Sequence, residues 1–190
     1  IEADNGVTPL YLASMKGHLN VVQALLLQDC VNVIAADSTG KTALHMAARN
    51  GHFEVVQCLL EGGFSDVVIL SLSADKKSMK KLSALHVAVL NGHFMVTKIL
   101  LAAEKIDLDS KFAGGSTLLS FAALNGHNVV AQLLLDEGAD VNVVDAQGLA
   151  PLDVALSQEH DKILQLLVRQ EDIILNATSE RGGKLLLTAS

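Results

Sequence analysis

The sequence predicts an all-α fold made of helix pairs that repeat about every 34 residues. One motif, "TPLYLA" at 8–13 and "TALHMA" at 42–47, returns as "SALHVA", "TLLSFA" and "APLDVA", with starts 34, 41, 34 and 33 residues apart. A second motif, "GH", keeps the same step at positions 17, 51, 92 and 126. A fixed period of this size indicates stacked copies of one supersecondary unit.

Each copy opens with the signals of a helix N-terminus. In four copies a hydroxyl side chain precedes the apolar run, where it can accept hydrogen bonds from the backbone N–H groups of the first turn. Pro9 and Pro151 occupy the next position, where the fixed φ of proline suits a helix. A first helix is therefore expected after each capping residue: Thr8, Thr42, Ser83 and Thr117.

A turn and a second helix complete each copy. Glycine adopts a left-handed backbone cheaply, and one stands about ten residues after each cap, so it is expected to end the first helix. Stretches such as "VVQALLL" (21–27) and "VVQCLL" (55–60) then show the apolar stripe of a second helix. The turn glycines are Gly17, Gly51, Gly92 and Gly126.

This order of helix, turn, helix and loop, with "TPLH"-type and "NGH" signatures, resembles the ankyrin repeat from about residue 3 to the last residue. The resemblance implies an all-α ankyrin-repeat solenoid of stacked antiparallel helix pairs, with β-hairpin or loop fingers along its concave edge. One unit cannot bury its apolar face alone, so neighbours share a core. We expect a single domain over 1–190 with five units, 4–36, 37–70, 78–111, 112–144 and 145–178, a partial sixth at 179–190 and a hairpin insert at 66–81.

All seven histidines fall on repeat positions. His45 and His86 stand three residues after a cap, where a side chain can reach back to it; the other five follow the turn. A zinc site needs three or four donors at about 2.0–2.3 Å from one ion, whereas equivalent side chains on stacked helices are offset by about 8–10 Å. The resemblance implies that both sets are hydrogen-bonding struts, so we assign no metal ligand.

The composition of the chain argues against several classes of function. A net charge of −7 and 3% aromatic residues disfavour nucleic-acid binding. Cys30 and Cys58 form no disulfide or metal pattern, and Cys58 lies in an apolar stripe, which favours a buried structural thiol in a reducing compartment. No leader or membrane-spanning run appears, so we expect a cytoplasmic location, with the nucleus as the alternative. No catalytic or cofactor-binding residue stands out.

The insert carries a concentration of positive charge. Its four lysines and Asp75 sum to +3, which leaves −10 for the rest of the chain. The two interpretations are a solvated loop, which we favour, and a contact for an acidic partner or lipid headgroup. The lysines are Lys76, Lys77, Lys80 and Lys81.

A variable position near the end of each first helix is a candidate partner contact. Three of its five residues are large and apolar, and in the geometry that the resemblance implies they would line the concave groove. The alternative is that some of them tuck between repeats. The residues are Met15, Arg49, Leu90, Leu124 and Ser157.

Asn142 is a candidate modification site. The resemblance implies that an asparaginyl hydroxylase can act on the Asn of "L-x5-D-V-N", and Leu134, Asp140, Val141 and Asn142 have that spacing. Asn32, in "CVN", lacks the acidic residue. The alternative, that Asn142 serves the turn alone, is the one we favour.

The fifth copy is degenerate, because Ala150, Asp153 and Glu159 replace the capping hydroxyl, the histidine and the turn glycine. Glu159 would be strained if its φ stayed positive. The tail "GGKLLLTAS" (182–190) repeats the first half of a unit, and the chain starts without methionine on what resembles a hairpin. We therefore expect a piece of a longer ankyrin array.

These observations favour a non-catalytic protein–protein interaction module or scaffold, which binds a protein partner through its groove and hairpin tips. The alternative is the regulatory ankyrin region of a larger catalytic or channel protein, such as a kinase, a ubiquitin ligase component or an ion channel. No cofactor and no direct membrane insertion are expected. Flanking sequence would discriminate the two, through a kinase signature or an apolar run of about 20 residues.

Overall fold

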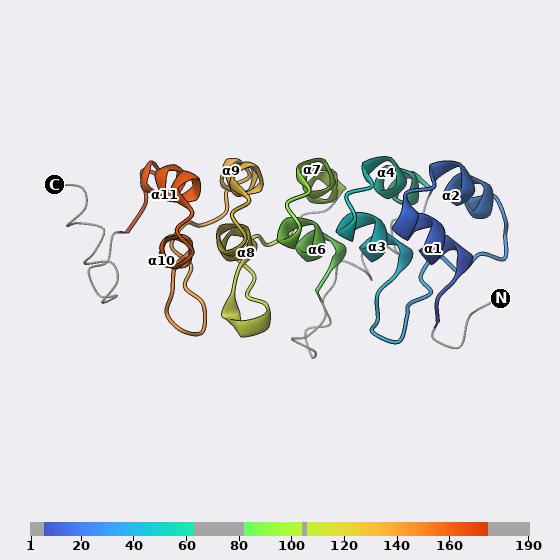
Figure 1. Cartoon of the computed structure of the whole chain (residues 1–190), viewed down its shortest axis with the longest axis horizontal. Helices are drawn as coiled ribbons and strands as arrows, with labels where there is room; N and C mark the ends of the chain where they lie inside the picture. The colour runs from blue at the N-terminus through green and yellow to red at the C-terminus, as the bar shows by residue number, and fades with distance from the viewer. Residues whose placement is uncertain (1–5, 63–81, 104–105, 175–190) are drawn as a thin grey trace. The chain divides into compact units, whose positions relative to one another are not determined.

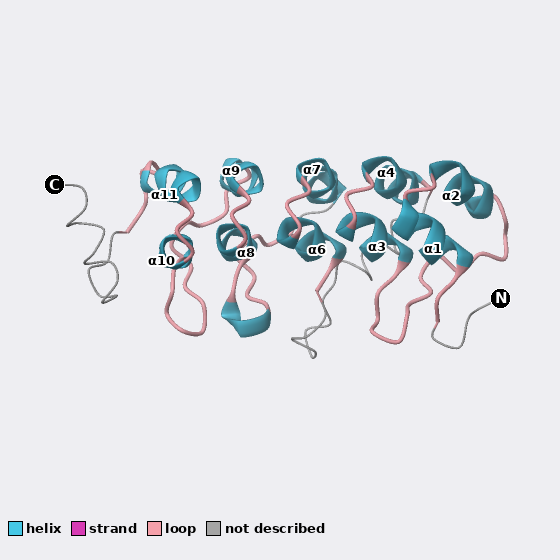
Figure 2. Ribbon diagram, in the orientation of Figure 1, coloured by secondary structure: helices cyan, strands magenta, loops and turns pink. Residues whose placement is uncertain are grey.

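The structure, a computed structural model, describes residues 6–62, 82–103 and 106–174 (Figure 1). The chain divides into two compact units, Ile1–Ile106 and Asp107–Ser190. Within the described ranges each unit is a stack of helix pairs without a β-strand (Figure 2). The predicted all-α fold class is therefore confirmed.

The first unit contains three helix pairs. The first helices α1, α3 and α6 pack side by side, the second helices α2, α4 and α7 form a parallel layer, and each first helix packs on its own second helix (Figure 1). The bounds are α1 Pro9–Lys16, α2 Leu19–Leu26, α3 Ala43–Arg49, α4 Phe53–Glu61, α6 Ala84–Leu90 and α7 Phe94–Ala103.

The second unit repeats the arrangement with two described pairs. Helix α8 packs against α9 and α10, and α11 packs against α9 and α10. A short 3₁₀ turn, η1, lies in the loop before α8. The bounds are η1 Ala113–Gly115, α8 Leu118–Leu124, α9 Asn128–Asp136, α10 Pro151–Ser157 and α11 Asp161–Val168.

The helix starts lie where the capping residues predict them. The Oγ1 of Thr8 accepts a hydrogen bond from the backbone N–H of Tyr11 at 3.1 Å, and that of Thr117 accepts one from Ser120 at 3.3 Å. Pro9 and Pro151 are the first residues of α1 and α10. Each cap satisfies an N–H group that the helix itself leaves unpaired.

Gly51 shows why the turn between paired helices needs glycine. Its φ is 74°, and a Cβ there would lie only 2.6 Å from Nδ1 of His93. Both the left-handed backbone and the close approach of the ring exclude a side chain. In the fifth copy Glu159 holds the same conformation with a φ of 57°, so the predicted strain is present and costs about 1–2 kcal/mol.

The core of each unit lies between its two layers of helices. In the first unit Leu85 and Leu100 are fully buried, and in the second unit Leu118 and Leu134 are. Each such leucine stabilises the fold by about 1.5–3 kcal/mol relative to an exposed one. Because these residues come from both helices of a pair, the pair and its neighbours form a shared core, as repeat proteins require.

The loops between pairs are tight turns organised by aspartate. The N–H of Asp37 donates to Lys41 O at 2.9 Å, and its Oδ1 accepts the N–H groups of Thr39 and Lys41 at 2.8 and 3.0 Å. Asp145 makes the same set of bonds with Gln147 and Leu149. The expected hairpin fingers are therefore present as loops, with one isolated bridge pair, Ala36 and Thr42.

Several sequence predictions fall outside the described residues. They are the insert at 66–81 with its four lysines, and the partial unit at 179–190. Within the described ranges, every helix is too short or too polar to cross a membrane.

Candidate protein-binding surfaces

The predicted contact residues of the first unit lie at equivalent places on neighbouring helices. Met15, Arg49 and Leu90 are at the last or next-to-last position of α1, α3 and α6. Because these three helices pack side by side, the residues form one row, which we call the first-helix row. Arg49 is exposed, whereas Met15 and Leu90 are half-buried, so the two apolar members are accessible but not fully projecting.

Histidines of the following copies hold the backbone of this row. The Nε2–H of His52 donates to the carbonyl of Met15 at 3.1 Å, and that of His93 donates to the carbonyl of Arg49 at 2.9 Å. Each bond joins one helix pair to the next through a main-chain acceptor. The side chain at the row position takes no part in that bond, so its identity can vary without loss of the strut.

The second unit has the same arrangement. Leu124, at the end of α8, is 44% exposed, and its carbonyl accepts the Nε2–H of His160 at 3.2 Å. Ser157, at the end of α10, is exposed, and its hydroxyl donates to the carbonyl of Val154 at 2.8 Å. Each unit therefore presents its own set of row positions, and their joint use as one groove stays a prediction.

The two histidines near helix starts form buried capping networks. Nδ1 of His45 accepts the backbone N–H of Thr42 at 3.2 Å, and its Nε2–H donates to the carbonyl of Leu82 at 3.1 Å. Nδ1 of His86 likewise accepts the N–H of Ser83 at 3.3 Å. Both rings are at most 5% exposed, so the capping role predicted from the sequence is present for both.

Burial sets the charge state of these rings. Desolvation, with a smaller contribution from the neighbouring His45, lowers the pKa of His86 to about 4. Desolvation also lowers the pKa of His45, although its bond to Leu82 opposes the shift. At neutral pH both rings are uncharged and hydrogen-bonded. Among the described residues no group of three or more His, Cys, Asp or Glu side chains is placed to hold a metal ion.

The Asp37 loop is also tied to the preceding helix. The hydroxyl of Tyr11 donates to Oδ2 of Asp37 at 2.9 Å. Burial alone would raise the pKa of the Asp37 carboxyl, but the hydrogen bonds from Thr39, Lys41 and Tyr11 outweigh it and lower the pKa to about 2. This loop is therefore rigidly held and negatively charged.

Asn142 uses its whole side-chain amide in the next loop. Its Nδ2 donates to the carbonyl of Asp172 and its Oδ1 accepts the N–H of Ile174, both at 2.8 Å. Its own N–H donates to Oδ1 of Asp140 at 2.8 Å. In the first unit Asn32 takes the place of Asp140 instead, because its Oδ1 accepts the N–H of Ile34 at 3.2 Å. Asn32 is therefore not the structural counterpart of Asn142.

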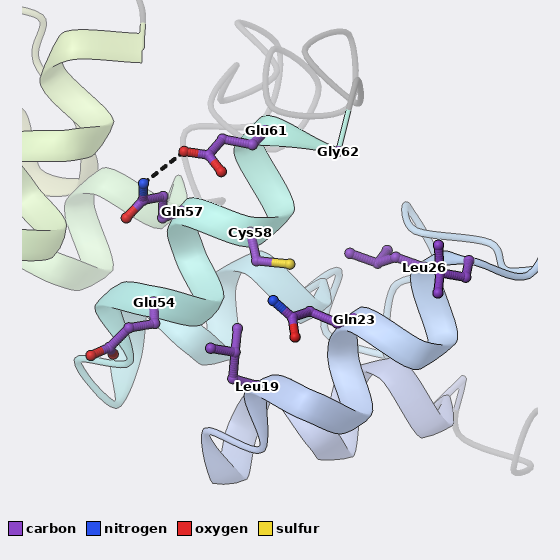
Figure 3. Close-up of a pocket in the computed structure, with 9 residues that line it drawn as sticks. Leu19, Gln23, Leu26, Glu54, Gln57, Cys58, Glu61 and Gly62 are labelled. Carbon is purple, nitrogen blue, oxygen red and sulfur yellow. Dashed lines mark hydrogen bonds between the residues drawn. The ribbon is translucent and has the colours of Figure 1, made fainter.

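A groove between α2 and α4 was not anticipated from the sequence. Its volume is about 620 Å³, and Leu19, Leu26 and Cys58 line it (Figure 3). Leu27, at its rim, is 82% exposed. The sequence feature that could have indicated this groove is Leu27, because the same position in later copies holds Glu61, Ala102, Asp136 and Arg169.

Comparisons with known proteins agree with the repeat architecture. A family model described as ankyrin repeats in three copies matches residues 1–71, 62–145 and 85–179. Protein fem-1 homolog A-like from Mus musculus is 39% identical over 182 residues, which is 96% of this chain and 27% of that protein. Rabankyrin-5 from Homo sapiens is 46% identical over 68 residues, 36% of this chain and 6% of that protein.

A third relative is the tyrosine-protein kinase HTK16 from Hydra vulgaris. It is 33% identical over 64 residues, 34% of this chain and 8% of that protein. The chain thus spans between 6% and 27% of the length of these three relatives.

Proposed function

Because the chain belongs to the ankyrin-repeat family, we propose that it is a non-catalytic interaction module or scaffold that binds a protein partner through its row positions and loop tips. The first-helix row of Met15, Arg49 and Leu90 carries the proposal. The fold uses the carbonyls of Met15 and Arg49 for its struts, which leaves their side chains available to match a partner. Accessible apolar side chains in a rigid row are typical anchors of protein interfaces.

The test is capture from cytosolic extract by the wild-type chain beside a Leu90→Ser, Leu124→Ser double variant. Both are first checked for equal helical content. A protein retained by the wild type and lost by the double variant supports recognition at the row positions. A Met95→Ser variant is the control, because Met95 is 50% exposed on α7, in the other layer of helices. Equal retention by all three proteins would exclude the row.

The chain also has a face that favours membership in a longer array. Val21 is 48% exposed, although the four equivalent side chains are nearly inaccessible. A further helix pair stacked on α1 and α2 would cover Val21 as its equivalents are covered. Val21→Ser should then cost more than 1 kcal/mol in a longer parent chain and far less in this one. The equivalents are Val55, Val96, Val130 and Ile163, all at most 2% exposed.

The second candidate is that this segment is the regulatory ankyrin region of a larger catalytic or channel protein. One relative is named a tyrosine-protein kinase, and the chain spans only part of each relative. Under this proposal the row binds another domain of the same polypeptide. Flanking sequence with a kinase signature, a ligase-recruiting motif or membrane spans would support it, and a complete reading frame without such elements would contradict it.

The four lysines of the insert are proposed as a secondary contact for an acidic partner. The support is their net positive charge in a chain of net charge −7. Replacement of Lys76, Lys77, Lys80 and Lys81 by glutamate should weaken capture of the same protein. Unchanged capture would leave them as a solvated loop.

Asn142 is proposed as a substrate for an asparaginyl hydroxylase, on the spacing of Leu134, Asp140 and Val141 before it. Its amide bonds to Asp172 and Ile174 must open before an enzyme can reach the side chain. Mass spectrometry should find one added oxygen on Asn142 after exposure to such an enzyme, and none in an Asn142→Gln variant. An unmodified Asn142 would remove the proposal.

A further inference from the structure

The groove between α2 and α4 is a second candidate interaction surface, on the helix layer opposite the first-helix row. It has an apolar wall formed by Leu19, Leu26 and Leu27 from α2. Figure 3 shows Cys58 projecting from α4 toward α2 across the groove, with Glu54 and Glu61 at its two ends.

A small residue at one repeat position creates the space. Cys58 stands seven residues after the turn glycine, and the later copies place Ile99, Leu133 and Leu166 there. A thiol is smaller than these branched side chains, so it fills less of the space between neighbouring second helices. The groove therefore lies where the second copy carries a small side chain at this position.

Leu27 also departs from the repeat, because it is a large apolar residue at a position that is acidic in two later copies. It is 82% exposed, whereas the next copy has Glu61 at this position and the fourth has Asp136. Single exposed leucines are common on protein surfaces, but this one adjoins an apolar groove of about 620 Å³. The combination provides both a pocket and an apolar rim for an incoming side chain.

The electrostatics of the groove favour a cation. Glu54 and Glu61 are both exposed, and none of the described residues that line the groove is a Lys or Arg. As equivalent helices of successive copies, α2 and α4 run in the same direction, and Leu27 and Gly62 at their C-terminal ends both line the groove. The C-terminal end of a helix carries a partial negative charge, which a nearby positive charge stabilises.

The carboxylate of Glu61 strengthens this end. Gln57 Nε2 donates to Glu61 Oε1 at 2.6 Å, which orients the carboxylate in the last turn of α4. A negative charge at this end of a helix is electrostatically unfavourable by itself. An Arg or Lys from a partner would neutralise both the carboxylate and the helix end.

We propose that this groove binds a basic amphipathic segment of a partner protein. One apolar side chain packs against Leu26, Leu27 and Cys58, and a Lys or Arg next to it pairs with Glu61. This site lies on a different helix layer from the first-helix row, so either surface can bind without the other.

The probe is a short synthetic helix with leucines along one face and lysines beside them. Fluorescence anisotropy measures binding of the peptide to the 190-residue chain. The rate of Cys58 alkylation, measured in a Cys30→Ser background, shows whether the bound peptide covers the groove. We expect saturable binding that slows alkylation of Cys58. A second peptide with glutamates for the lysines, and a third with serines for the leucines, should bind about tenfold more weakly or worse.

Three substitutions alter the groove, and the first two introduce a residue that another copy carries at the same position. Cys58→Ile fills the groove, Leu27→Glu removes the apolar rim, and Glu61→Gln removes the charge. Each should weaken binding of the Leu/Lys peptide by about tenfold. Two control variants, Met95→Ser on α7 and Leu90→Ser in the first-helix row, should leave the affinity unchanged, and circular dichroism checks that all of them fold.

The alternative occupants give different results. Equal binding by wild type and all three groove variants, or binding that does not protect Cys58, would overturn the proposal. So would the absence of binding. Faster alkylation of Cys58 after replacement of residues 66–81 by a Gly-Ser linker would assign the groove to the chain itself and would also overturn it. Failure here with capture still dependent on Leu90 would leave the proposed function intact.

Discussion

The two units of this chain use different side chains at the same position, three residues after the helix cap. In the first unit this position holds Tyr11, whose hydroxyl bonds to Asp37, and then His45 and His86, which are buried and bond to the cap. In the second unit the position holds Ser120, whose hydroxyl is hydrogen-bonded to the Thr117 hydroxyl at 3.3 Å, and Asp153, whose Oδ2 accepts the N–H of Ala150 at 3.1 Å. Each of these side chains makes a hydrogen bond, and the second unit shows that the fold does not require an imidazole at this position.

The difference has a consequence for pH dependence. Protonation of a buried imidazole would place a charge in an apolar site and destabilise the fold, whereas a serine hydroxyl gains no charge in mild acid. The copies that carry the buried His45 and His86 should therefore respond to mild acid through this position, and the copy that carries Ser120 should not.

The largest effect is acid destabilisation of the first unit. The pKa of His86 is about 4 in the folded state and 6.5 unfolded, so the unfolded chain binds the proton more readily. Stability from this group is complete above pH 6.5 and is lost as pH falls from 6.5 to about 4, by about 3 kcal/mol. His45 acts in the same direction.

Native-state hydrogen exchange with mass spectrometry can measure this loss unit by unit. Peptides from α3 and α6 should lose protection between pH 6.5 and 4.5 more than peptides from α8, which carries Ser120 at this position. A His86→Ser variant, which carries the residue found at Ser120, should lose most of this pH dependence. Equal losses in the two units would contradict the comparison.

The second effect concerns the turn after the first helix. Gly51→Ala should destabilise the first unit by about 2 kcal/mol, because a Cβ would combine a positive φ with a contact 2.6 Å from His93. Gly148→Ala is the matched control, since Gly148 has a φ of 77° but open space around it. It should cost about 1 kcal/mol. Urea denaturation measures both, and equal costs would show that the ring contact contributes nothing.

The third effect has the opposite sign. Glu159, with a φ of 57°, holds the turn that glycine holds elsewhere. Glu159→Gly should stabilise the second unit by about 1 kcal/mol. Urea unfolding followed by helical circular dichroism tests this, and an unchanged or lowered midpoint would mean that the strain at Glu159 is offset by contacts of its side chain.

The smallest effect is restoration of a cap. Ala150 has no side-chain oxygen to cap α10, although its N–H donates to Oδ2 of Asp153 at 3.1 Å. Ala150→Ser should add about 0.5–1 kcal/mol of stability. The reciprocal change Thr117→Ala in the same unit should remove a similar amount, and a thermal melt compares the two. If neither variant moved the midpoint, the hydroxyl caps would be dispensable in this unit.

Features set by local sequence could be predicted. The caps, the first-position prolines, the turn glycines and the strained Glu159 all depend on backbone geometry within a few residues. The network of His45 and His86 could also be inferred, because each bonds to a residue three positions earlier. These elements fix the fold class.

Features set by contacts between copies could not be predicted. The bonds from Asn142 to Asp172 and Ile174 depend on how one loop meets the next. The motifs "CVN" and "DVN" pair Asn32 with Asn142, whereas in the structure Asn32 makes the bond that Asp140 makes. The α2–α4 groove depends on the volume of one side chain, Cys58, relative to its equivalents. The half-burial of Met15 and Leu90 likewise follows from packing against neighbouring helices.

We infer that the buried histidines stabilise the repeats and that the exposed surfaces carry recognition. The most direct test is an NMR titration of the imidazoles of His45 and His86 in the intact chain. We predict that both rings stay neutral, with the proton on Nε2 of His45, as pH falls through 6.5, and that His86 titrates near 4 or only on unfolding. Titration of either ring near or above 6.5 would contradict it, because such a ring would be solvated and available for chemistry.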